Sequence, residues 1–66
     1  MIGTNLRKLR ISRQLSQEIL AKIARIPRTA YVQIETGKRK LMATELRYIC
    51  IALGVSADML LAEDSQ

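Results

Sequence analysis

Helix start and stop signals divide this 66-residue chain into short segments, and they restrict its fold more than any other feature. Ser16 is a favoured helix N-cap residue, Pro27 fits at or just before a first helical turn, and Gly37 and Gly54 are natural helix stops. Between these signals the apolar residues repeat with helical spacing. The sequence therefore predicts an all-α fold, with helices over about residues 2–13, 16–24, 27–36, 44–53 and 57–62.

Apolar side chains in each segment are candidates for the core. In the second segment we expect Ile19, Leu20 and Ile23 to make apolar contacts. In the fourth segment the core face is expected to carry Leu46, Ile49, Cys50 and Leu53. Because Tyr31 and Tyr48 are the only aromatic residues, we expect a mainly aliphatic core.

Chain length and residue types exclude several classes of function. The chain is long enough for one domain, expected over 1–66, and too short for a deep catalytic cleft beside it. Histidine is absent and Cys50 is the single cysteine, which excludes disulfides, ordinary zinc sites and His-based catalysis. We therefore expect no metal, cofactor, small-molecule ligand or enzymatic activity. No signal peptide or membrane span is expected, so the cytoplasm is the default location.

Charge is distributed unevenly along the chain. The formal net charge is +5. Ten of the eleven Lys and Arg residues and two of the six acids lie in residues 1–40, which gives this part a charge of +8 against −3 for residues 41–66. A basic front and a mildly acidic back indicate a polyanion on one side, although a solvated charged surface is the simpler alternative.

Four motifs occur in a fixed order along the chain. They are Leu15-Ser16-Gln17-Glu18, Leu20-Ala21, Ile34-Glu35-Thr36-Gly37-Lys38 and Ala52-Leu53-Gly54-Val55-Ser56. With these motifs the chain resembles, over about residues 2–62, the Cro/cI-type (XRE) family of phage repressors and related bacterial regulators. The resemblance implies a compact five-helix, lambda-repressor-like domain with a central helix-turn-helix at about residues 16–36.

Base-reading residues follow from the position of the second helix of that motif. In a helix-turn-helix this helix lies in the major groove of double-stranded DNA and reads bases with its N-terminal residues. Arginine can pair with guanine, glutamine with adenine, and threonine or valine can contact a thymine methyl group. The candidate base-reading residues are Arg28, Thr29, Val32 and Gln33. An ordinary polar surface is the alternative.

Phosphate contacts are expected on both sides of the reading helix. The resemblance implies that Gln17 brings a side chain and a helix N-terminus onto a phosphate. The basic loop residues Lys38, Arg39 and Lys40 are further candidates, with solvated loop charge as the alternative. Arg25 stands where the family usually has glycine, so a left-handed backbone is expected there, and a phosphate contact would offset its cost.

Three further expectations come from the family pattern. Arg10 and Glu35 match a structural salt bridge that holds the reading helix against the first helix. Tyr31 takes a position that usually carries isoleucine or valine. Met42 replaces a usual Ser or Thr cap, so we expect the fourth helix to start late, at Thr44.

Apolar residues near the C-terminal end indicate a partner surface. The candidate dimer residues, in the helices over about 44–62, are Tyr48, Ile51, Met59 and Leu61. A two-fold homodimer would place two reading helices about one DNA turn apart and favour a near-palindromic site. Isolated surface hydrophobes, which are common, are the alternative.

Two classes of function remain. The first is a sequence-specific transcription regulator of bacterial or phage origin, acting in the nucleoid as a dimeric repressor or as an activator similar to restriction–modification controllers. Glu18 matches a position that some family members use to touch RNA polymerase, although Lys22, one turn on, is basic. The second is an antitoxin-like or adaptor protein that binds a protein partner through its C-terminal apolar surface.

Overall fold

The computed structural model describes residues 2–61, and within them the chain forms five helices and no strand. Their bounds are α1 Ile2–Ser12, α2 Gln17–Ala24, α3 Arg28–Glu35, α4 Ala43–Leu53 and α5 Ala57–Leu61. The predicted all-α fold class is therefore confirmed. The last residue of the helix expected over 57–62 lies outside the described residues. No helix in the described part is both long and apolar enough to cross a membrane.

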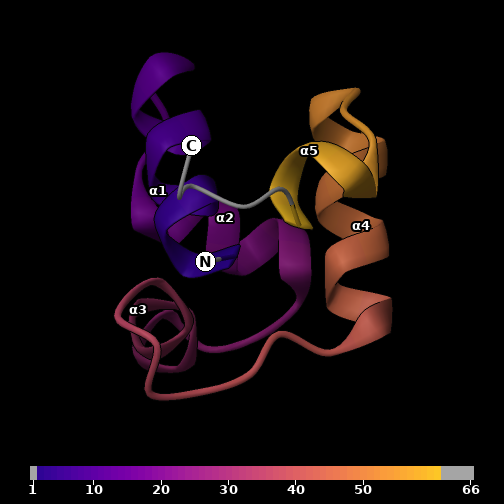
Figure 1. The fold of residues 1–66 in the computed structure, drawn as a ribbon. Coiled ribbons are helices and arrows are strands. Elements are labelled where there is room, and N and C mark those ends of the chain that lie inside the picture. The colour runs from indigo at the N-terminus through magenta and orange to yellow at the C-terminus, as the bar shows by residue number, and fades with distance from the viewer. Residues whose placement is uncertain (1, 62–66) are drawn as a thin grey trace.

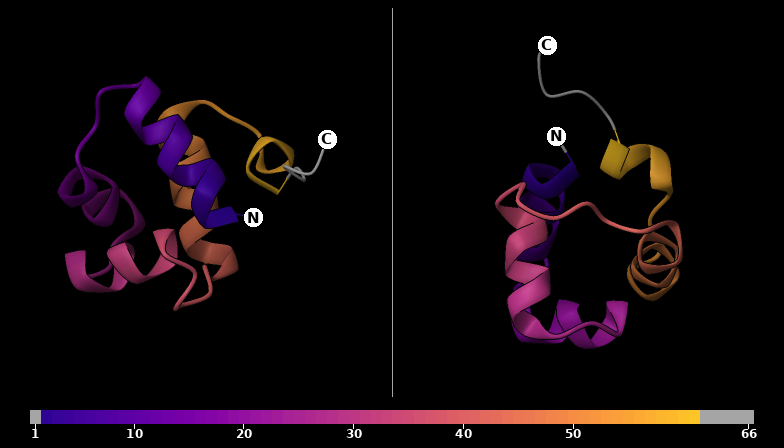
Figure 2. Two further views of the ribbon diagram at one scale, coloured as in Figure 1. Left: turned by 60° about the vertical axis from the view of Figure 1, so that its left-hand side comes forward. Right: turned by 90° about the horizontal axis from the view of Figure 1, so that it is seen from below.

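The helices pack around one core to which each of them contributes. α2 packs against α3 and α4, and α1 packs against α3 and α5. Figure 1 shows α4 and α5 together on one side of the molecule, with α3 at the opposite lower corner. The right-hand view of Figure 2 shows α2 crossing α3 steeply, as in a helix-turn-helix pair. The large side chains with 2% exposure or less are Leu6, Leu20, Tyr31, Ile34, Ile49 and Leu60.

Helix α2 has well-formed ends that its sequence explains. At the start, Ser16 Oγ accepts a hydrogen bond from the Ile19 N–H at 3.1 Å, as expected for an N-cap. At the other end, Arg25 has φ 64° and ψ 42°, the left-handed conformation expected from its place in the motif. Of the three α2 residues expected to make apolar contacts, Leu20 is fully buried and Ile23 packs against the core, whereas Ile19 is 44% exposed.

The bounds of α3 and α4 follow local signals. Pro27 precedes α3 with φ −62°, and Gly37 follows its end with φ 83°. The late start predicted for α4 is wrong by one residue, because α4 begins at Ala43. The carboxylate of Glu45 accepts the Met42 N–H at 2.9 Å, which satisfies a free backbone donor at this helix start without a Ser or Thr cap.

Helix α1 is held closely against the C-terminal end of α3. Gly3 is buried, and a Cβ atom there would lie 2.9 Å from the carbonyl oxygen of Glu35 and closer still to that of Ile34. Only glycine permits this approach of helix to backbone. Polar contacts hold α1 and the residue after it elsewhere: Asn5 Nδ2 donates to the Leu60 carbonyl oxygen at 2.8 Å, and Arg13 Nη1, just past the end of α1, donates to that of Leu53 at 2.7 Å.

Candidate nucleic-acid interface

The four candidate base-reading residues lie together at the surface of α3. Arg28, Thr29 and Gln33 are exposed, Val32 is half-buried, and together they line one open hollow. The opposite side of α3 carries its buried residues, Tyr31, Ile34 and Glu35. The structure thus places all four on one accessible face. No acidic residue lies in the first turn of α3, so no carboxylate there would repel a nucleic acid.

The buried side of α3 is anchored by a polar cluster centred on Glu35. Its carboxylate accepts hydrogen bonds from Arg10 Nε at 2.7 Å, Arg10 Nη2 at 3.3 Å, Tyr31 Oη at 2.6 Å and Gln17 Nε2 at 3.2 Å. These four residues, here called the Glu35 cluster, come from α1, the first residue of α2, and α3. Glu35 therefore ties three helices to one carboxylate.

The charge states in the Glu35 cluster follow from its hydrogen bonds. Burial alone would raise the pKa of Glu35, but hydrogen bonds from Arg10, Tyr31 and Gln17 outweigh it and hold that pKa below its ordinary value. Burial, and then the hydrogen bond to Glu35, raises the pKa of Tyr31. At neutral pH the cluster thus contains a carboxylate, a guanidinium and a neutral phenol. A buried ion pair satisfied in this way orients α3 against α1.

The position of Gln17 differs from what the motif alone indicates. Its side-chain amide donates to Glu35, a contact that sequence reasoning missed because Gln17 was expected to face a phosphate and no motif pairs it with Glu35. A primary amide has two N–H donors, so one remains for a second acceptor. Gln17 is half-buried at the start of α2, next to the capped N-terminus. Its side chain can therefore join the Glu35 cluster and still face an anion.

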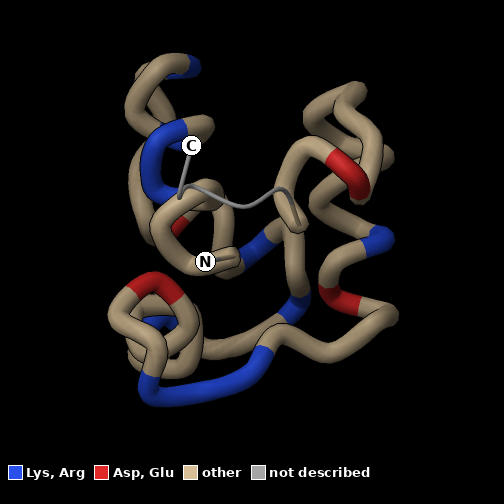
Figure 3. Tube along the Cα trace, in the orientation of Figure 1, with Lys and Arg blue, Asp and Glu red and all other residues tan. Residues whose placement is uncertain are grey.

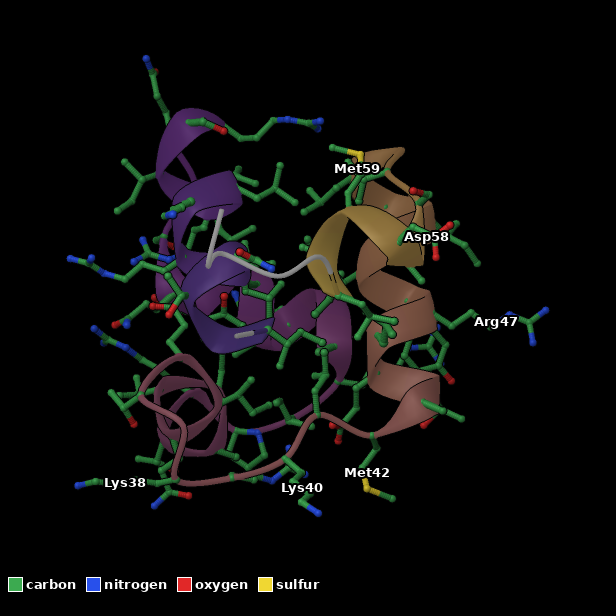
Figure 4. The ribbon with its side chains drawn as sticks, in the orientation of Figure 1. Lys38, Lys40, Met42, Arg47, Asp58 and Met59 are labelled. Atoms are coloured by element: carbon green, nitrogen blue, oxygen red, sulfur yellow. The ribbon has the colours of Figure 1, made fainter. Side chains whose placement is uncertain are left out.

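The three basic residues of the loop after α3 differ in whether their side chains face solvent or pair with α4. Lys38 and Lys40 are exposed and point away from the body of the molecule in Figure 4. Figure 3 shows the basic segment running along this loop below α3. Arg39 instead donates to both carboxylate oxygens of Glu45 at 3.1 and 3.0 Å, and this pair holds the pKa of Glu45 below its ordinary value. Arg39 thus fastens the loop to α4, a role that the sequence did not indicate.

Arg25 faces α4 in the structure. Its guanidinium carbon lies 4.4 Å from the centre of the Tyr48 ring, within the range of a cation–π contact. Tyr48 is half-buried, whereas Ile51, Met59 and Leu61 are 70%, 57% and 56% exposed. The candidate dimer residues on α4 and α5 therefore include three apolar side chains open to solvent.

Potential metal ligands and the one cysteine are distributed as follows in residues 2–61. No group of three or more potential His, Cys, Asp or Glu ligands lies together within residues 2–61. Cys50 is half-buried, and burial raises the pKa of its thiol, which disfavours the reactive thiolate.

Known proteins that are similar to this chain share its helix-turn-helix architecture. A family model described as a helix-turn-helix domain matches residues 3–64. Among solved structures, the restriction-modification controller protein C.AhdI from Aeromonas hydrophila is similar, with a TM-score of 0.81 and 30% sequence identity over 89% of each chain. No curated protein matches the chain. The resemblance inferred from the sequence is thus confirmed, and the chain belongs to the helix-turn-helix domain family.

Proposed function

We propose that this protein is a transcription regulator that binds double-stranded DNA sequence-specifically and reads it with α3. The observation that carries the proposal is the division of α3 into two faces. One face presents Arg28, Thr29 and Gln33 to solvent, and the other is fixed through Glu35. A reading helix needs both, because bases are discriminated only when exposed donors and acceptors are held in a defined orientation.

We assign phosphate contacts to the candidate residues whose side chains have no partner on α4. Lys38 and Lys40 extend from the loop beside α3, and Gln17 stands at the N-terminus of α2, where a helix favours an anion. Arg39 is engaged with Glu45 and Arg25 with Tyr48, so both are assigned to supporting the interface. The proposed DNA surface therefore has base-reading residues on α3 and phosphate-binding residues on either side.

A symmetric dimer through α4 and α5 completes the proposal. The exposed side chains of Ile51, Met59 and Leu61 supply apolar area for such a contact. Two copies related by a two-fold axis would recognise a near-palindromic operator and block a promoter by occupying it. The likeness to a restriction-modification controller protein supports the role of a DNA-binding regulator.

Activation through RNA polymerase has less support than repression. Glu18, the candidate polymerase contact, has Lys22 Nζ 3.9 Å from its carboxylate, and both side chains are largely exposed. The neighbouring positive charge reduces the negative potential that a basic polymerase surface would meet. Repression by occupancy needs no such contact, so it is the mode we propose.

Selection of bound duplexes from a random DNA pool, at near-physiological salt, tests the proposal. We expect enrichment of two inverted half-sites. Arg47→Ala is a matched control, because Arg47 points outward from α4, away from Lys38, and its loss changes net charge as much as Arg28→Ala does. The control should select the same site, whereas Arg28→Ala should lose preference at one base pair. Salt-sensitive binding without any enrichment would contradict the proposal and favour a protein-partner role for the apolar surface.

A further inference from the structure

The turn between α2 and α3 contains an arginine in a conformation that usually belongs to glycine. Arg25 closes α2 with φ 64° and ψ 42°. Its N–H donates to the Lys22 carbonyl oxygen at 3.1 Å, and the Ile26 N–H donates to that of Ala21 at 3.0 Å. These two bonds are the pattern of a Schellman motif, in which the left-handed residue is normally glycine because a Cβ is disfavoured there. Arg25 thus keeps the geometry of the turn and adds a long cationic side chain to it.

That side chain spans the distance to another helix. The guanidinium of Arg25 lies over the ring of Tyr48, 4.4 Å from its centre. Tyr48 belongs to α4, whose Ile49 is fully buried in the core, so the ring is attached to a fixed part of the molecule. A shallow groove between α2 and α4 is lined by both residues together with Ile23 and Ile51. The stack therefore links the turn of the helix-turn-helix directly to α4.

Only two residues separate this contact from the reading helix. Ile26 packs against the core, and Pro27 has its φ fixed at −62° by its ring. A change in the position of Arg25 is therefore passed on to Arg28, the first residue of α3. The Glu35 cluster acts at the other end of α3. We infer that Arg25 and Tyr48 are a positioning pair that sets the N-terminal end of the reading helix, and that Arg25 acts in DNA binding through Tyr48 without touching a phosphate.

Because this role presupposes the DNA-binding function proposed above, the test uses both DNA and the free protein. A short duplex that carries half of the selected operator, here called the half-site, binds one protomer. The affinity for the half-site is therefore independent of any effect of Tyr48 on dimer formation. We would titrate this half-site and a scrambled duplex with wild type, Arg25→Gln, Tyr48→Leu, the double variant and Tyr48→Phe. Circular dichroism establishes that each variant is folded at the titration temperature.

A positioning pair makes four connected predictions. Arg25→Gln and Tyr48→Leu should each weaken half-site binding by about two- to five-fold, the size of an exposed cation–π contact. The double variant should be no weaker than the weaker single variant. Tyr48→Phe, which keeps the ring, should bind as wild type does. Binding to the scrambled duplex, and the salt dependence of half-site binding, should stay nearly unchanged, because no phosphate contact is lost.

Other outcomes would overturn the inference. A phosphate contact by Arg25 predicts equal losses on both duplexes for Arg25→Gln and a salt slope lower by about one. Additive losses, or full affinity of Tyr48→Leu, would show that the two residues act separately. In the free protein, nuclear magnetic resonance should show the side-chain protons of Arg25 shifted by the Tyr48 ring. If that shift is present but no duplex is preferred, the proposed function fails; if an operator is bound without the coupling, the positioning role fails.

Discussion

Replacing Tyr31 by phenylalanine removes one oxygen atom from the buried Glu35 cluster and leaves the ring in the core. The lost bond is short, 2.6 Å from Tyr31 Oη to Glu35 Oε2, and Tyr31 has no exposed surface. A hydrogen bond to a charged group contributes about 1.5–3 kcal/mol to stability. Glu35 keeps its bonds to Arg10 and Gln17, so Tyr31→Phe should lower the free energy of unfolding by about that amount.

This loss is large for a domain of 66 residues. At about 0.05–0.15 kcal/mol per residue, the whole domain has roughly 3–10 kcal/mol of stability. The variant should therefore unfold at a Tm lower by about 6–24 °C. Urea titration at pH 7 measures the free energy, and an unchanged m-value would show that the denatured states are comparable. Tyr48→Phe, which removes a hydroxyl from a half-buried ring, is the matched control.

The pH dependence tests the cause of the loss. Because the pKa of Glu35 is lowered from its ordinary value of 4.5 in the folded protein, its contribution to stability is complete above that value and disappears as pH falls through the folded pKa. Tyr31→Phe removes one of the bonds that lower this pKa, so the stabilities of the two proteins should converge in acid. A difference below about 0.5 kcal/mol at pH 7, or one that persists well into acid, would refute the assigned role of the Tyr31–Glu35 bond.

Three further predictions concern the proposed DNA and dimer surfaces. Arg28→Ala should weaken binding to the selected site by about 1–3 kcal/mol and relax preference at one base pair, whereas equal loss on all sequences would remove Arg28 from the base-reading set. Lys38→Ala should weaken all duplexes alike and lower the salt slope by about one in titrations at several salt concentrations; a loss confined to one sequence would contradict a phosphate contact. Ile51→Asp places a charge on a side chain that is 70% exposed and should shift the protein toward monomer in sedimentation, and no shift would place the interface elsewhere.

Helix ends were predictable from sequence because the signals that set them are local. Ser16 caps α2 through an N–H three residues away, and Gly37 and Gly54 have the positive φ that a helix stop requires. The start of α4 was misplaced because Glu45, and not a capping side chain at Met42, supplies the acceptor. A carboxylate that reaches back three residues leaves only a weak signal in the sequence.

The exposure of the candidate site residues was predictable from sequence, but their contacts with other helices were less so. Exposure of Arg28, Thr29 and Gln33 follows from helical periodicity together with the motif. The partners chosen by Arg25 and Arg39 depend on where α4 lies, and no spacing along the chain encodes that. For the same reason, sequence reasoning identified both residues as basic groups near DNA and missed that each has a partner on α4.

The close approach of Gly3 to α3 has a consequence for mutational mapping. Any side chain at this position meets the carbonyl oxygens of Ile34 and Glu35, which are backbone atoms and cannot rotate away. Substitution would therefore push α1 away from the C-terminal end of α3. A saturation screen scored only by operator binding would rank Gly3 beside the proposed base-reading residues, although Gly3 has no side chain and is buried. Scoring the same library for protein abundance would separate the two groups, since substitutions at Arg28 should leave abundance intact and those at Gly3 should not.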